Sequence, residues 1–291
     1  MRNTETMENR PATKEEYLRT INRLTEYINN HLGDEIDVGV LAAESGFSAW
    51  HFHRITRAFL GEPVWAYIIR MRLETAARLL RYSDMTVSDV AYRVGYDVPS
   101  SLSKAFRQAY GISPNQYRKC KNFSIMKPMQ VNPGLTIETE VREVSDTDII
   151  YIRLTGRYDT LDFPGTWQRM RPYLAENDLG DWCPDWICIY YDDPKVTEPS
   201  KLRTDVCYTT PRALPGKGER GSRVLRGGRF AVFRYVGPYS NLGSVYDTVY
   251  GKLLPESGLR IKDEPAYEKY VNDPVGTTPD KYATEIYIPV E

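Results

Sequence analysis

Histidine and cysteine are scarce in this chain, which has three histidines and four cysteines among 291 residues. His51 and His53 are two residues apart, which on a helix places them on different faces. A zinc site and a disulfide framework are therefore not indicated, and we expect reduced thiols, no metal and no cofactor. The cysteines contain no Cys-x-x-Cys pair: they are Cys120, Cys183, Cys188 and Cys207.

Long apolar segments are also absent from the sequence. No run approaches the roughly 20 apolar residues that a membrane-spanning helix needs. The first 16 residues, MRNTETMENRPATKEE, are polar and contain no hydrophobic stretch of the kind found in secretory signal peptides. We therefore expect a cytoplasmic protein that has no membrane partner.

The charge is nearly balanced, at −1, but it is divided unevenly along the chain. The first 127 residues carry 18 basic and 14 acidic side chains, whereas the remaining residues carry 20 and 25. The first part is thus net positive and the second part net negative. Only the first part favours a polyanionic partner.

The sequence does contain two internal repeats of different period. Residues 41–47 (LAAESGF) correspond to 90–96 (VAYRVGY), and residues 51–61 correspond to 101–111, at offsets of 49 and 50. Further on, LTGRYDTL (154–161) corresponds to YVGPYSNL (235–242), and 192–208 to 272–288, at offsets of 81 and 80. Because each repeated unit needs its twin to bury its apolar face, two repeats of different type predict two domains.

The first repeat has the pattern of paired helices joined by a tight turn. Asp37 and Ser48 are suited to cap helices, and Gly46 allows a turn that a side chain would resist. A short helix, a turn with glycine and a second helix describe a helix-turn-helix, here present twice. From apolar periodicity and capping residues we expect helices at 17–32, 38–45, 49–60, 63–80, from 84 or 86 to 94, from 99 onward, and from Ser113-Pro114.

Residues 17–119 resemble the AraC/XylS family of bacterial DNA-binding domains, through the segments GFSAWHFHR, YIIRMRLETAARLL, VSDVAYRVGYD and FRQAYGISPNQYRK. The first copy departs from the family pattern at Thr56, where the second copy has Phe106, and at Glu62-Pro63, where it has Ser113-Pro114. We expect slightly different packing there. The resemblance implies that two recognition helices enter adjacent segments of the major groove on one face of the DNA.

Helix geometry selects the candidate DNA contacts. Phe52, Ile55 and Phe59 share one face and are assigned to the core, and so are Leu102 and Phe106. On the opposite faces, arginine can read guanine with two hydrogen bonds and tryptophan can contact thymine methyl groups, while other basic side chains contact phosphates. The candidate residues are Trp50, His51, His53, Arg54, Arg57, Ser100, Ser103, Lys104 and Arg107.

The second repeat has the pattern of an α+β domain. Two β-rich runs, 149–154 and 230–236, each lead through Gly-x-Tyr into a helix, expected at 163–177 and 242–256. Two strands follow each helix, at 187–191 and 204–208 in the first copy and at 267–271 and 284–288 in the second. This predicts a duplicated β-α-β-β unit that forms an antiparallel sheet with helices on one face and an open opposite face.

Residues 134–291 resemble the GyrI-like, or SOUL-type, effector-binding domain, mainly through RFAVFRYVGPYSNL, KYVNDP and TEIYIPV. An AraC-type domain followed by a GyrI-like domain is the order of the Rob-like subfamily. The resemblance implies a transcriptional regulator, an activator, whose partners are double-stranded promoter DNA, a small-molecule effector and RNA polymerase. It divides the chain into a polar tail (1–16), a DNA-binding domain (17–122), a linker (123–134) and an effector-binding domain (135–291).

The ligand site is predicted to lie in a groove between the two halves, on the open face of the sheet. The family's ligand-binding glutamate matches Glu285, and period-2 alternation places Glu285 and Tyr287 on that face. A carboxylate among aromatic rings suits a lipophilic cation. Trp167 and Trp186 are candidate pocket walls, and Asp205, the repeat counterpart of Glu285, is a candidate second polar group.

Two other functions are compatible with the second half. GyrI-like proteins include hydrolases of reactive small molecules, and Glu285 could act as a base with Tyr287 as a proton donor. A module that binds another protein is the third possibility. The DNA-binding half argues against an enzyme as the main role, so we predict a regulator.

Overall fold

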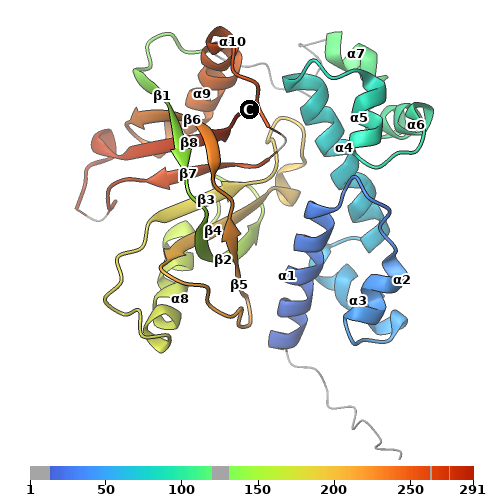
Figure 1. Cartoon of the computed structure of the whole chain (residues 1–291), viewed down its shortest axis with the longest axis horizontal. Coiled ribbons are helices and arrows are strands. Elements are labelled where there is room, and N and C mark those ends of the chain that lie inside the picture. The colour runs from blue at the N-terminus through green and yellow to red at the C-terminus, as the bar shows by residue number, and fades with distance from the viewer. Residues whose placement is uncertain (1–13, 120–130, 263, 275) are drawn as a thin grey trace, which may run out of the picture.

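The structure is a computed structural model, and it describes residues 14–119, 131–262, 264–274 and 276–291. Two domains lie side by side: a helical domain (residues 14–119) and a sheet domain (residues 131–291) (Figure 1). The predicted linker lies largely outside the described residues, as do Cys120 and most of the polar tail. Where they are described, Cys183, Cys188 and Cys207 are free thiols.

The helical domain has the predicted helices, with ends shifted by no more than a few residues. Asp37 caps α2 by accepting hydrogen bonds from the backbone of Gly39 and Val40. Thr86 and Asp89 form a capping box at the start of α5. The helices are α1 (Lys14–Asn30), α2 (Val38–Glu44), α3 (Ala49–Leu60), α4 (Val64–Tyr82), α5 (Val87–Arg93), α6 (Pro99–Tyr110) and α7 (Pro114–Lys119).

Glycine is required at the turn of the second helix-turn-helix. Gly95 has a φ of +80°, a backbone conformation that side chains disfavour. A Cβ atom at this position would lie 2.5 Å from the carbonyl oxygen of Leu32. The turn therefore needs a residue without a side chain because of both its backbone angle and the loop that follows α1.

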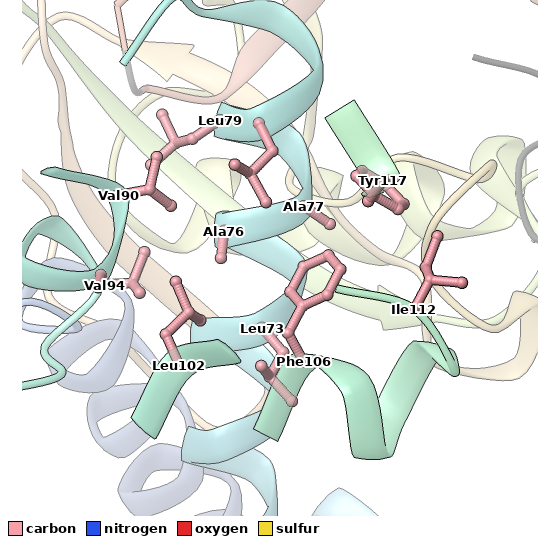
Figure 2. Close-up of a cluster of buried hydrophobic side chains, with 12 residues drawn as sticks. Leu73, Ala76, Ala77, Leu79, Val90, Val94, Leu102, Phe106, Ile112 and Tyr117 are labelled. Carbon is pink, nitrogen blue, oxygen red and sulfur yellow. The ribbon is translucent and has the colours of Figure 1, made fainter. Parts of the chain in front are cut away.

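Helix α4 contributes to two separate hydrophobic cores and so joins the two helix-turn-helix modules. Its first half supplies Tyr67, Ile68 and Met71 to a core shared with α1, α2 and α3. Its second half supplies Ala76 and Leu80, among others, to the core shared with α5, α6 and α7 that Figure 2 shows. Because α4 is a single continuous helix, it sets the relative placement of the two modules.

The two cores differ where the sequence departs from the family pattern, as expected. Phe106 is fully buried in the second module, whereas its counterpart Thr56 is buried at 1% exposure in the first. The Thr56 hydroxyl donates to the Phe52 carbonyl at 2.8 Å, which satisfies its polar group. The assignment of Phe59 to the core is wrong, because its side chain is 40% exposed near the end of α3.

Within the described residues, the sheet domain is a single antiparallel sheet of eight strands with the order β1-β6-β8-β7-β3-β4-β2-β5. Six of the strands were predicted, and the edge strands β1 and β5 were not. The repeated unit is therefore β-β-α-β-β instead of β-α-β-β. The strands are β1 (Ile137–Val144), β2 (Thr147–Thr155), β3 (Trp186–Tyr190), β4 (Arg203–Thr210), β5 (Arg220–Leu225), β6 (Gly228–Val236), β7 (Ala266–Tyr270) and β8 (Ala283–Pro289).

The strand order is symmetric about the central pair β3 and β7, and the two halves exchange their edge strands. Strand β1, from the first copy, pairs with β6 of the second, and β5 pairs with β2 of the first. In the central pair, Cys188 lies directly opposite Glu268. These two residues are also repeat counterparts, so the axis that relates the halves passes between them.

The sheet domain's helices pack on one face of the sheet, as predicted. Helix α8 (Phe163–Glu176) covers the first half. The second half is covered by α9 (Leu242–Thr248), a π-helical turn (Val249–Leu253) and α10 (Leu254–Ser257), where one continuous helix was expected. Pro255 has no backbone N–H to donate, which weakens the α-helical pattern one turn earlier.

The prediction that the opposite face is open is wrong for one half. Helix α1 of the helical domain lies against this face beside β5 (Figure 1). Asn29 and Tyr67 both accept hydrogen bonds from Arg203, at 2.8 and 2.9 Å. Only the half formed by β1, β6, β8 and β7 leaves this face uncovered by α1.

Candidate functional sites

The two recognition helices present the predicted polar faces. On α3, His53, Arg54 and Arg57 are exposed while Phe52 and Ile55 are buried. On α6, Ser100, Lys104 and Arg107 are exposed, and Ser103 is half-buried beside Leu102 and Phe106. The Trp50 side chain lies outside the described part of the structure. The exposed basic groups of both helices therefore lie on the solvent-facing side, away from the buried residues.

His51 differs from its neighbours because it is engaged within the helical domain. Its Nε2 atom lies 3.1 Å from the Tyr17 hydroxyl, and its ring packs at 5.1 Å from that of Phe47. These contacts hold the start of α3 against α1 and the turn after α2. His51 therefore positions the recognition helix in addition to any contact that it makes with DNA.

The five residues predicted to share a ligand groove lie at separate places. Trp167 of α8 and Trp186 of β3 pack together on the helix-covered face, with their rings 5.3 Å apart. Glu285 and Tyr287 lie on the opposite face, as alternation predicted, with the Tyr287 hydroxyl donating to Glu285 at 2.7 Å. The prediction of one groove that contains all five is wrong, because the sheet separates the tryptophans from Glu285.

Glu285 already has a cationic partner. The Arg142 guanidinium lies 3.1 Å from its carboxylate and also contacts the Tyr287 hydroxyl. Burial opposes the ionised form of Glu285, but the hydrogen bonds from Tyr287 and Arg142 outweigh it and lower its pKa. A cavity of about 290 Å³ beside this pair is lined by Tyr267 and Lys269, among others.

Asp205 cannot contact a ligand in this structure because α1 covers it. Its side chain is fully buried and accepts hydrogen bonds from Arg153 at 2.7 Å and from Arg223 at 3.0 Å. Both arginines also face Glu26 of α1, whose carboxylate lies 2.9 Å from Arg223. The predicted role of Asp205 at the groove is wrong. It belongs to the contact between the two domains.

Sequence reasoning missed Glu268, a buried glutamate on the helix-covered face of the sheet. Its side chain is only 2% exposed, and it accepts hydrogen bonds from Tyr270 at 2.7 Å and Tyr190 at 3.2 Å. Burial raises the pKa of Glu268, although the tyrosine hydroxyls partly offset this effect. The repeat could have identified this residue, because an offset of 80 aligns Glu268 with Cys188, a residue of apolar character in the first copy.

Aromatic rings surround Glu268 at the junction of the two halves. Trp167 packs edge-on against Tyr270 at 5.5 Å, and its ring also meets that of Trp186. The Tyr246 hydroxyl is also buried beside this carboxylate, and together with the hydroxyls of Tyr270 and Tyr190 it opposes the effect of burial on the pKa of Glu268. A carboxylate enclosed by aromatic rings has the chemistry that receives a lipophilic cation.

Among the described residues, no cluster of three histidine, cysteine or acidic side chains could hold a metal ion. No helix in the same part of the chain is long and apolar enough to cross a membrane.

Two helix-turn-helix modules joined to a sheet domain with an enclosed acidic site define a DNA-binding regulator that carries its own ligand-binding domain. A family described as a GyrI-like small molecule binding domain matches residues 137–291, and a helix-turn-helix family matches residues 41–120. The chain belongs to the GyrI-like family, and its arrangement is that of a transcriptional regulator.

Two relatives in the comparison are named as regulators. The transcriptional regulator Rob of Salmonella typhimurium is 25% identical over 285 residues, which cover 93% of this chain and 97% of that protein. The regulatory protein SoxS of the same organism is 32% identical over 98 residues, covering 34% of this chain and 92% of SoxS. Among solved structures, the DNA-binding domain of AdpA in complex with a target DNA is 34% identical, with a TM-score of 0.34, covering 35% of this chain and 91% of that one.

Proposed function

We propose that this regulator responds to a small lipophilic cation that binds at Glu268. The single observation that carries the proposal is a buried carboxylate of raised pKa, enclosed by Tyr190, Tyr246 and Tyr270, with Trp167 packed against Tyr270. Rings supply apolar area and cation–π attraction, and the carboxylate supplies the opposite charge. Trp167 and Trp186 keep their predicted role as pocket walls, while Glu268 takes the role assigned to Glu285.

Crystal violet, a cationic aromatic dye, and its neutral leuco form provide a test with matched skeletons. We expect the full-length protein to bind crystal violet with micromolar affinity, about −8 kcal/mol, and the leuco form more weakly. Quenching of tryptophan fluorescence would report the binding because Trp167 and Trp186 adjoin the site. Equal affinity for the two dyes would contradict the proposal that the positive charge of the ligand contributes to binding.

The binding of the cation should depend on pH. The raised pKa keeps Glu268 protonated at pH values above the ordinary glutamate pKa of about 4.3, whereas a bound cation favours the ionised form. Binding below the raised pKa therefore releases a proton, and the affinity falls as the pH falls, by up to about tenfold per pH unit. Calorimetric titrations from pH 5.5 to 8 measure this slope, which the Glu268→Gln variant should lack.

We propose that α3 and α6 read two segments of promoter DNA about one helical turn apart. The exposure of Arg54 and Lys104 on these two helices supports this arrangement. An activator of this kind acts on RNA polymerase at the promoter and works in the cytoplasm, where DNA is accessible. The helical domain supplies the contacts to DNA, and the acidic sheet domain does not.

Substitution of two arginines separates reading of bases from attraction to phosphates. Arg54→Ala should cost about 1–3 kcal/mol and relax the preference at one base pair, because arginine reads guanine with two hydrogen bonds. Arg107→Ala should weaken all sequences alike and reduce the salt dependence of binding. Binding to a site selected from a random DNA library measures both effects. An unchanged affinity and base preference in Arg54→Ala would remove this residue from the interface.

Hydrolysis of a reactive small molecule is the second candidate activity. The observation that favours it is the Glu285–Tyr287 hydrogen bond beside a cavity of about 290 Å³. The ion pair with Arg142 lowers the pKa of Glu285 and makes the carboxylate a weaker base, which counts against it. Turnover of activated aryl esters that disappears in Glu285→Gln would establish the activity.

A further inference from the structure

A loop of the sheet domain, the bridging loop (residues 191–202, between β3 and β4), touches both ends of α4. Near the start of α4, Lys201 lies 3.5 Å from Glu62. At the other end, Asp193 accepts a hydrogen bond of 2.9 Å from Tyr82, the last residue of the helix. Between these points, Val196 packs against the core of the second helix-turn-helix module. A single loop therefore contacts the helix that joins the two DNA-reading modules along its length.

Arg203, directly after the bridging loop, anchors it to the first module. Its guanidinium is buried at 7% exposure and forms two hydrogen bonds with Asp192, at 2.7 and 2.9 Å. The same group donates to Asn29 of α1 at 2.8 Å and to Tyr67 of α4 at 2.9 Å. Because the arginine geometry is rigid and all of these partners are fixed, a shift of Arg203 displaces α1 and α4 together.

A continuous series of contacts links Glu268 to this anchor. Tyr190 donates to Glu268 and packs its ring edge-on against that of Tyr158, at 4.9 Å. The Tyr158 hydroxyl lies 3.1 Å from the carbonyl oxygens of both Asp192 and Arg203. A ligand that replaces the hydrogen bond between Tyr190 and Glu268 therefore moves the Tyr190 ring. That ring packs on Tyr158, whose hydroxyl contacts the two ends of the bridging loop.

A second series of contacts reaches the other end of α4. The Tyr246 ring, beside Glu268, is stacked with that of Tyr250 at 6.2 Å, and Tyr250 contacts Tyr82 at 4.9 Å. Tyr82 in turn donates to Asp193 of the bridging loop. Both series thus begin at the enclosed acid and end on the loop that spans the two modules.

We propose that Tyr158 and Arg203 are positioning residues for DNA recognition, which make the relative placement of the two helix-turn-helix modules depend on whether the Glu268 site is occupied. This inference rests on the proposed function of that site. It has a specific consequence: the effector alters binding to DNA that engages both modules, and leaves binding through one module unchanged. Coupling of this kind is reciprocal, so DNA alters the affinity for the effector by the same factor.

The test uses the full-length protein, crystal violet, and a DNA site selected with the wild-type protein from a random library. A second DNA has the segment read by one module scrambled. Saturating dye should change the affinity for the intact site by about 5–150-fold, in either direction, and the affinity for the scrambled site by less than about twofold. The intact DNA should change the dye dissociation constant by the same factor as the dye changes DNA binding.

Two conservative substitutions interrupt the path, and a third serves as the control. Tyr158→Phe keeps the ring on Tyr190 and removes the hydroxyl that meets the bridging loop, and Tyr67→Phe removes a partner of Arg203 in the helical domain. Each should keep the dye affinity and the dye-free DNA affinity within about twofold of wild type, while the response to dye falls below about twofold. The control is Tyr239→Phe, the repeat counterpart of Tyr158, which packs against Tyr270 and Tyr282 of its own domain and should keep the full response.

Each other outcome contradicts the proposal at a defined point. A full response in both Tyr158→Phe and Tyr67→Phe would overturn the path, and an equal response on the scrambled site would overturn the dependence on two modules. If the wild type binds dye with no change in DNA affinity, the coupling is absent while the function proposed for Glu268 stands. If crystal violet does not bind, the proposed function fails and the inference fails with it.

Discussion

Glu268→Gln should abolish the preference for a cationic ligand while leaving the fold intact. Removing one member of a buried charge pair costs about 2–5 kcal/mol, which corresponds to at least roughly 30-fold in the affinity for crystal violet. The neutral leuco dye, which does not use the charge, should lose no more than about twofold. The glutamine can still accept hydrogen bonds from Tyr190 and Tyr270, so the site keeps its shape.

The matched control is Glu285→Gln, the same substitution on the opposite face of the sheet. This variant should bind crystal violet like the wild type, because the strand backbone separates Glu285 from Trp167 and Trp186. Calorimetric titration of the three proteins with the two dyes distinguishes the two acids. A large loss in Glu285→Gln with none in Glu268→Gln would return the ligand site to the uncovered face.

Glu268→Gln should also stabilise the ligand-free protein. The pKa of Glu268 is raised in the folded state. As the pH rises above about 4.3, this carboxyl group therefore ionises in the unfolded chain before it ionises in the folded protein. The folded protein loses stability over this range, until the pH passes the raised pKa. Glutamine does not ionise, so Glu268→Gln should melt at a higher temperature than wild type at neutral pH. A lower melting temperature would show that Glu268 contributes to stability.

Asp205→Asn should loosen the contact between the two domains. The substitution leaves Arg153 and Arg223, whose side chains are 9% and 20% exposed, with one fewer negative charge, and breaking an ion pair whose acid is fully buried costs about 3–5 kcal/mol. The loss falls on the surface where α1 meets the sheet, because both arginines also contact Glu26. We expect a lower melting temperature and a connecting segment that proteases cleave faster than in wild type.

A counterpart of this substitution exists within the chain. Arg142 and Glu285 occupy the repeat positions of Arg223 and Asp205, but the Arg142 and Glu285 side chains keep 39% and 13% exposure. Glu285→Gln should therefore cost under about 1 kcal/mol, as a partly exposed ion pair does. Equal losses in the two variants would mean that the cover supplied by α1 adds nothing. Below about pH 4, where the lowered pKa of Asp205 is approached, wild type should lose the same contact.

The elements of this fold were predictable where one periodicity dominates a segment. The helices around Leu102 and Phe106 follow from apolar spacing and capping residues, and the recognition faces follow from the same spacing. Phe59 was misplaced because the final turn of α3 projects beyond the core, which periodicity alone does not reveal. The strands β1 and β5 were missed because they are edge strands rich in charged residues, a composition that strands usually avoid.

The ligand site was harder to predict because it depends on which acid is buried. Glu285 and Glu268 both alternate with aromatic residues in short strands, and only the packing of α8 and Tyr246 makes one of them enclosed. The burial of Asp205 depends on the docking of a separate domain, for which the sequence of its own strand holds no signal. Local patterns thus identify faces of an element, while the choice between faces is made by distant segments.

The exchange of edge strands bears on how the sheet domain can have arisen. One copy of the β-β-α-β-β unit cannot close its own half-sheet, because its first strand pairs only with the other copy. A protein with one unit would form the same eight-stranded sheet as a strand-swapped homodimer, with a true twofold axis between its third strands. In such an ancestor the residues at 188 and 268 would be identical and would face each other. Fusion of the two units into one chain removes that constraint, so that a single acid can lie on the axis opposite a thiol.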